Sequence, residues 1–180
     1  MKRFYYAAAI IGVAAVVLLL QGGTKGVRAA NGGMQAFGFN APLITGFPGR
    51  SVEITGGGSY QLPFTVHAGG GFRCLSNIVA PPPPFAGCLA GQGVRWDPAA
   101  LLASTSFKCT GAGSEARKTA STDDKTVVLL ADFYRQGDGN NESFTARMIV
   151  SQTDIAPEIP GVQNVWIEGI GCGEATANFN

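Results

Sequence analysis

The sequence predicts an all-β antiparallel domain, and within that class we expect a two-sheet β-sandwich of the jelly-roll or immunoglobulin-like kind. Eight to ten short runs rich in β-branched and aromatic residues follow one another along the chain, several with a period of two. The 26 glycines in 180 residues are about twice the usual share, and many of them lie between these runs. No run shows a sustained helical period that would predict crossover helices, so short antiparallel strands joined by glycine turns are expected.

The segment from Lys125 to Val150 is predicted to be the central hairpin of this fold. Its first arm is apolar on both faces as far as Ala131, which is typical of a strand covered on both sides. The turn formers QGDGNN at residues 136–141 separate it from a second arm. In the second arm Phe144 and Met148 share one face, and polar residues occupy the other.

The remaining elements are expected on both sides of this hairpin in the sequence. Tyr60–His67 alternates most regularly, and because Pro63 cannot donate to a ladder we expect an edge strand. The glycine triplet at residues 56–58 is expected to be a bulge or a turn, and the triplet at residues 69–71 a turn. Asp97 followed by proline predicts a turn or a single helical turn that ends near residue 102. The other expected strands are Met34–Phe39, Ser51–Thr55, Phe72–Leu75, Cys88–Asp97, Ser104–Thr110, Val162–Gly171 and Ala175–Phe179.

Residues 1–29 are predicted to be a signal peptide, and residues 30–180 a single exported domain. A basic start precedes an apolar run from Ala7 to Leu20, and Val27 and Ala29 place small or modest side chains where signal peptidase needs them. The alternative is an uncleaved membrane anchor, but the apolar residues only reach the lower limit of what spans a bilayer. We therefore expect a secreted or periplasmic protein with no stable membrane insertion after cleavage.

The charge of the mature chain argues against nucleic-acid binding. Cleavage after Ala29 removes four of the 13 basic residues and none of the 12 acidic ones, which leaves nine against twelve. The formal net charge of the mature chain is thus near −3, and no run of Lys or Arg remains in the sequence that could follow a phosphate backbone.

The four cysteines, Cys74, Cys88, Cys109 and Cys172, are expected to form two disulfides. All four lie in the exported part, where paired cysteines are common, and they show no CxxC or CxxH spacing for zinc. If the chain from residue 94 onward runs as an up-and-down meander, Cys88 and Cys172 lie at one end and Cys109 at the other. We therefore favour Cys74–Cys109 with Cys88–Cys172, and the sequential pairing Cys74–Cys88 with Cys109–Cys172 is the alternative.

No catalytic motif is present in the sequence. A Ser-His-Asp or Cys-His site would have to use His67, which is expected on an exposed strand face. Asp132 and Glu168 form the best carboxylate pair for glycoside hydrolysis, but we expect both carboxylates near strand ends in water. Arg135 or Arg147 is expected to pair with Asp132 and to lower the pKa of that carboxyl.

Two further features are candidate binding sites. Tyr134, Trp96 and Trp166 could form an exposed aromatic row for a glycan, although we expect both tryptophans in the core. At the hairpin tip Asp138, Asn140 and Glu142 alternate and offer oxygen ligands for calcium, a weak candidate because an ordinary glycine-asparagine turn explains the same residues. We expect no cofactor.

The sequence thus favours an exported, disulfide-bonded, non-catalytic β-sandwich that acts as a structural or binding module of the cell envelope or extracellular space. The alternative is a small carbohydrate-active enzyme or carbohydrate-binding domain. A protein or a glycan would suit either role as a partner.

Overall fold

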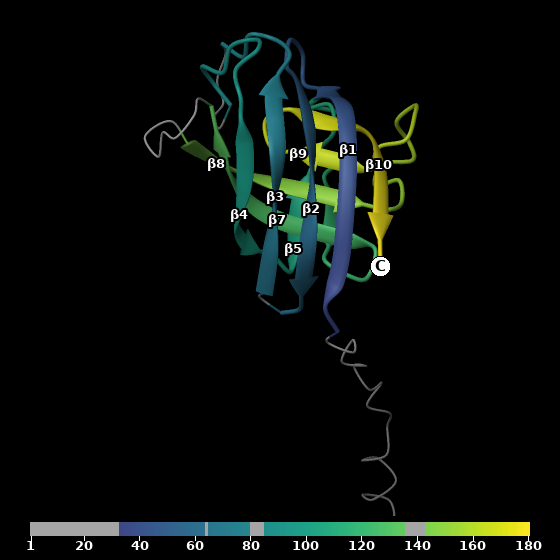
Figure 1. Ribbon diagram of the computed structural model, residues 1–180. Helices are drawn as coiled ribbons and strands as arrows, with labels where there is room; N and C mark the ends of the chain where they lie inside the picture. Colours follow the sequence, from purple (N-terminus) through teal and green to yellow (C-terminus); the bar gives the residue numbers. More distant parts are fainter. Residues whose placement is uncertain (1–32, 64, 80–84, 136–142) are drawn as a thin grey trace, which may run out of the picture. The chain divides into compact units, whose positions relative to one another are not determined.

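The described part of the protein is an eight-stranded antiparallel barrel with one additional hairpin (Figure 1). The computed structural model describes residues 33–63, 65–79, 85–135 and 143–180. No helix within these ranges is long and apolar enough to cross a membrane. The strands are β1 (Gln35–Gly46), β2 (Ser51–Gln61), β3 (Thr65–Cys74), β4 (Arg95–Leu101), β5 (Ser104–Phe107), β6 (Lys118–Ser121), β7 (Thr126–Tyr134), β8 (Ser143–Ser151), β9 (Val165–Ile167) and β10 (Gly171–Phe179).

Each barrel strand pairs with the next barrel strand in the sequence, and β10 closes the circle on β1. In Figure 1 the near wall consists of β4, β3, β2 and β1, and strands β7, β8 and β9 run across it behind. Strands β7 and β8 pair over their whole length, from Thr126 opposite Ser151 to Tyr134 opposite Ser143. The predicted central hairpin is therefore confirmed, while its tip lies outside the described residues.

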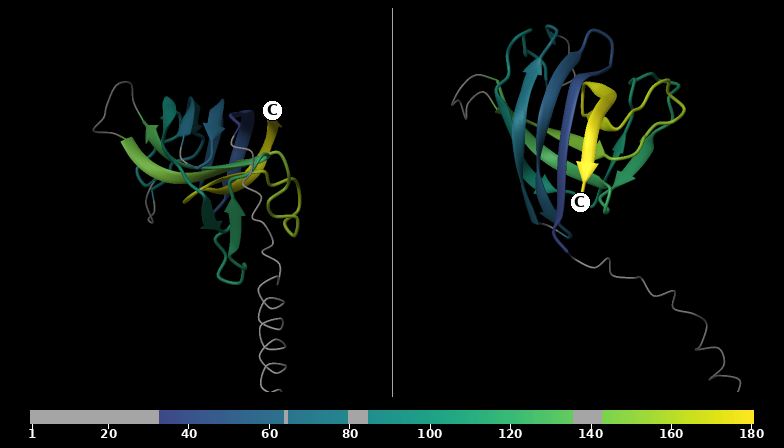
Figure 2. Two further views of the ribbon diagram at one scale, coloured as in Figure 1. Left: turned by 90° about the horizontal axis from the view of Figure 1, so that it is seen from below. Right: turned by 45° about the vertical axis from the view of Figure 1, so that its right-hand side comes forward.

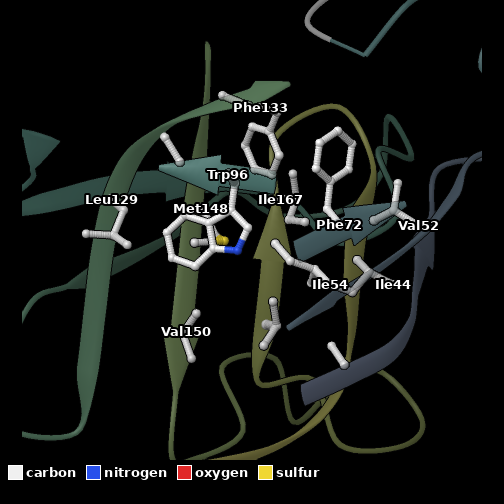
Figure 3. Packing of buried hydrophobic residues seen from close by; sticks show 14 of the residues in the cluster. Ile44, Val52, Ile54, Phe72, Trp96, Leu129, Phe133, Met148, Val150 and Ile167 are labelled. Carbon is white, nitrogen blue, oxygen red and sulfur yellow. The ribbon is translucent and has the colours of Figure 1, made fainter. Parts of the chain in front are cut away.

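The barrel interior is filled with apolar side chains from both walls (Figure 3). Alternate residues of β7 point inward, among them Leu129 and Phe133, and Met148 of β8 joins them. Trp96 of β4 lies at the centre, fully buried, and its Nε1 donates a hydrogen bond to the carbonyl oxygen of Thr55 at 3.1 Å. Burying rings and branched chains in this way is the main stabilising contribution to such a fold.

The β5–β6 hairpin forms a second layer on the outer face of the β7–β8–β9 wall (Figure 2). Val128 and Ile149 point away from the barrel interior, yet they are fully buried because this layer covers them. Phe107 of β5 and Trp166 of β9 meet there at 5.8 Å between ring centroids. The two-sided apolar pattern of β7 is explained by this arrangement, as the sequence predicted.

The two glycine triplets lie inside strands and not at turns, contrary to expectation. Residues 56–58 of β2 pair with residues 68–70 of β3, so the triplets face each other in the barrel wall. A Cβ added at Gly56 would lie 2.5 Å from Cζ2 of Trp96 and 2.6 Å from the carbonyl oxygen of Gly69. Only glycine fits at residue 56, because the indole of Trp96 packs directly against the backbone there.

The expected sandwich is wrong in its topology, since the main sheet closes into a barrel. Both architectures use short antiparallel strands with one apolar face, and therefore the same local pattern. They differ in a long-range pairing, here Phe37 of β1 opposite Phe179 of β10, which local alternation does not encode. Two local predictions also fail: Pro63 lies in the β2–β3 turn, and Asp97 lies in β4 opposite Asp132.

All four cysteines form disulfides, but the favoured pairing is wrong: the bonds are Cys74–Cys88 and Cys109–Cys172. The favoured pairing assumed that the chain from residue 94 to Cys109 forms one arm of an up-and-down meander. Instead, the chain leaves the barrel after β4 and crosses its outer face as β5, which brings Cys109 beside the start of β10. There the amide of Cys172 donates to the carbonyl oxygen of Cys109 at 3.3 Å. Two disulfides indicate an oxidising environment.

Candidate functional site

A groove of about 840 Å³ lies between the β1–β2 turn, the loop after β5 and the β9–β10 turn. Sites for small molecules usually occupy roughly 300–1,000 Å³. The side chains that distinguish this groove are four cations, one carboxylate and three aromatic rings. We call it the basic groove and define it by Arg50, Lys108, Arg117, Arg147, Glu168, Phe47, Phe107 and Trp166.

The loop after β5, which forms one wall of the basic groove, is held in place by Glu115. The carboxylate of Glu115 accepts hydrogen bonds from the amides of Cys109 (2.6 Å) and Thr110 (2.8 Å). It also accepts from the Thr110 hydroxyl at 2.6 Å and from Nζ of Lys118 at 2.9 Å. Partial burial alone would raise the pKa of this carboxyl, but these hydrogen bonds outweigh burial and lower the pKa to about 2.

The same loop is fixed at its start by the Cys109–Cys172 disulfide and by close backbone packing. Both Gly46 and Gly171 have positive φ angles, and a Cβ added to either would collide with the carbonyl oxygen of Cys109. Trp166 donates from Nε1 to the carbonyl oxygen of Lys108 at 2.8 Å. The wall is therefore pre-organised by covalent, hydrogen-bonding and packing contacts.

The acidic residue of the groove, Glu168, is committed to Arg147. Nε and Nη2 of Arg147 donate to the two carboxylate oxygens, and the Arg147 amide adds a hydrogen bond of 3.1 Å. These hydrogen bonds from Arg147 hold the pKa of Glu168 below its usual value, despite the opposing effect of burial. Glu168 therefore stays ionised near neutral pH and is poorly suited to donate a proton.

The other three cations differ in how they are held. Arg50 donates from Nη1 to the carbonyl oxygen of Gly169 at 2.8 Å, and its guanidinium lies over the Phe47 ring, 5.7 Å from the centroid. Nζ of Lys108 donates to the carbonyl oxygen of Ala112 at 3.1 Å. Arg117 is exposed and makes no hydrogen bond or ion pair with any other described residue. Arg117 is thus available to an incoming ligand.

The structure does not bring Asp132 and Glu168 together as a catalytic pair. Asp132 accepts a hydrogen bond from the Thr145 hydroxyl at 2.7 Å and is not part of the groove lining. The expected partner Arg147 pairs with Glu168 instead of Asp132. Glu168 is therefore paired with a guanidinium, and the described groove lining contains no second carboxylate with which it could act in hydrolysis.

The alternative of an exposed aromatic row formed by Tyr134, Trp96 and Trp166 is not found. Trp96 is buried in the barrel and Trp166 in the outer layer, as expected of core residues. Tyr134 is half-buried beneath the guanidinium of Arg95, whose carbon lies 4.5 Å from the ring centroid. His67 is exposed on β3, as predicted.

The calcium hypothesis stays a prediction, because Asp138, Asn140 and Glu142 lie outside the described residues. Within the described ranges, no group of three or more His, Cys, Asp or Glu side chains could hold a metal ion.

Sequence reasoning missed the basic groove because its cations are far apart along the chain. Arg50 follows β1, Lys108 and Arg117 flank the loop after β5, and Arg147 lies in β8. No local run of basic residues in the sequence predicts the site. Barrel closure and the outer hairpin together bring these side chains to one place. Comparison with known proteins adds no assignment, since no family model, curated protein or solved structure matches the chain.

Proposed function

We propose that the chain is an extracytoplasmic, disulfide-bonded module that binds a ligand in the basic groove and carries out no catalysis. The two disulfides support an oxidising location, and one of them anchors a wall of the groove. The groove has the volume of a small-molecule site and combines apolar rings with a few fixed polar groups, which is typical of ligand sites.

The observation that carries the proposal is the ion pair between Glu168 and Arg147. A carboxylate that acts in hydrolysis needs a raised pKa or a nearby second carboxylate, whereas hydrogen bonding to Arg147 lowers the pKa of Glu168. A binding site has the opposite requirement, because its charges should stay fixed over the working pH range. The groove chemistry therefore supports recognition over turnover.

The two tryptophans of the chain provide a direct test of ligand binding. The indole N–H of Trp166 lies at the groove, hydrogen-bonded to Lys108, and that of Trp96 lies inside the barrel. In a nitrogen-15 NMR titration with a panel of neutral and charged oligosaccharides and peptides, we expect at least one ligand to shift the Trp166 indole signal. The Trp96 signal should stay in place. A panel that moves neither signal would contradict the binding role.

A parallel screen with glycan and ester substrates tests the absence of catalysis. We expect no turnover by the purified domain. Turnover that is abolished by Glu168→Gln or Asp132→Asn, with the thermal melt unchanged, would replace the proposal with the alternative of a small carbohydrate-active enzyme.

A further inference from the structure

We infer that the ligand of the basic groove is an acidic oligosaccharide, a short glycan that carries uronate carboxylates or sulfate groups. This inference rests on the proposed binding function and specifies the chemistry of its ligand. The distribution of charge, the contacts of the individual cations and the lining of the groove support it.

The distribution of charge selects an anion. Among the described residues, the groove lining contains four of the nine basic residues of segment 30–180 but one of its twelve acids. That acid, Glu168, is already neutralised by Arg147. The groove is thus a positive site on a domain whose formal net charge is near −3. Such a local field concentrates anions even when the whole molecule is negative.

The charged residues outside the groove limit the length of the ligand. Outside the groove, segment 30–180 retains five basic residues against eleven acids. A long polyanion such as a nucleic acid would leave the groove and meet this negative surface, which disfavours it. A ligand of a few sugar units can place its anionic groups on the cations and remain inside about 840 Å³.

Two cations on the loop after β5 are positioned to bind the anionic groups. Arg117 has no hydrogen bond or ion pair to another described residue, and Nζ of Lys108 contacts a carbonyl oxygen and no described carboxylate. The loop that carries them is fixed by Glu115 and by the disulfide of Cys109, so little ordering is needed on binding. A planar guanidinium binds carboxylate and sulfate groups through two parallel hydrogen bonds.

The lining also offers a surface for a sugar ring. Phe47 is half-buried at the groove, and its ring lies so close to Gly111 that a Cβ added to this glycine would be 1.8 Å from Cε1 of Phe47. Pro48 lies next to it and is exposed. The apolar surface of Phe47 and Pro48 beside the cations suits a pyranose whose apolar side packs on it and whose acidic substituent reaches Arg117.

The test compares ligands that differ in charge and class by calorimetry and by the Trp166 indole signal. The probes are tetragalacturonate, a heparin-derived tetrasaccharide, neutral cellotetraose, sodium sulfate and a short DNA duplex. We expect at least one acidic tetrasaccharide to bind and to shift the Trp166 signal, with an affinity that falls as salt is added. Tetragalacturonate alone would identify uronate as the recognised group, and the heparin fragment alone would identify sulfate.

Arg117→Ala is the decisive variant, because Arg117 has no described partner whose loss would destabilise the fold. We expect it to weaken binding of the acidic tetrasaccharide about tenfold, as loss of a hydrogen bond to a charged group does, with the melt unchanged. Lys125→Ala is the matched control, since Lys125 is an exposed cation that does not line the groove, and it should bind like the parent protein.

The inference is overturned, while the proposed binding function remains valid, if cellotetraose binds as tightly as the acidic tetrasaccharides. It is also overturned if Arg117→Ala binds them normally, if sulfate alone reproduces their affinity, or if the DNA duplex binds more tightly. Failure of the proposed function gives a different result, because then no ligand of any class moves the Trp166 signal.

Discussion

Replacing Glu115 by Gln should destabilise the domain in a pH-dependent way, because this carboxylate holds the groove wall through four hydrogen bonds. The side chain is 10% exposed, and the pKa of its carboxyl is lowered from 4.5 to about 2. This pKa difference of about 2.5 corresponds to a contribution of at most about 3.4 kcal/mol to the free energy of unfolding. Since the site lies close to solvent, we expect a loss of about 2 kcal/mol at pH 7.

The direction of the pH dependence follows from the lowered pKa of Glu115. The native state binds the proton less tightly than the unfolded chain, so the stabilisation is complete above the unfolded pKa of about 4.5. It is lost progressively as the pH falls from about 4.5 towards 2. The difference in unfolding free energy between the parent protein and Glu115→Gln should therefore shrink over this range.

Urea unfolding of both proteins at several pH values between 7 and 2.5 measures this difference. Glu174→Gln is the control for loss of one negative charge, since Glu174 is exposed on β10. A difference between parent and Glu115→Gln that stays constant down to pH 2.5, or that is absent at pH 7, would refute the reasoning.

Three further changes test the fold itself. Gly56→Ala should cost about 1–3 kcal/mol, because the added Cβ would lie 2.5 Å from the buried indole of β4; Gly38→Ala, whose Cβ has 4.0 Å to its nearest neighbour, should be nearly neutral in thermal melts. Asn164→Leu should cost about 2–4 kcal/mol by urea unfolding, because the buried amide makes hydrogen bonds of 2.7 and 2.9 Å to the backbone of β10. Replacing both Cys109 and Cys172 by Ala opens a loop of 63 residues and should cost about 4 kcal/mol in guanidinium unfolding, and a loss below about 1 kcal/mol would contradict this estimate of the cross-link.

The sequence was informative wherever the structure depends on neighbouring residues. The period-two pattern of β8 and the two-sided apolar run of β7 predict the central hairpin, because each strand must present its apolar face to a covering layer. The prediction of turns at the glycine triplets was wrong, because local sequence rules take no account of the Trp96 indole, which leaves no room for a Cβ at Gly56. Only the tertiary contact between Gly56 and Trp96 reveals why glycine is present there.

The candidate site depends almost entirely on contacts between distant parts of the chain. The path of β5 over the outer face decides the partner of Cys109 and also brings Lys108 towards Arg147. No local signal distinguishes a hairpin that leaves the barrel from a strand that continues it. Glu168 could be singled out from its position, but its guanidinium partner depends on strand register.

The pairing of β1 with β10 also determines when the barrel can form. Strand β1 is made first, yet one of its two edges finds its partner only after β10 has been synthesised. Until then, β1 presents unpaired backbone groups that could join a neighbouring chain. Contacts of such long sequence separation slow folding to milliseconds or seconds, in the range of other all-β domains. The nascent protein therefore passes through a period in which its first strand is most prone to aggregation, and this period ends when the last strand docks.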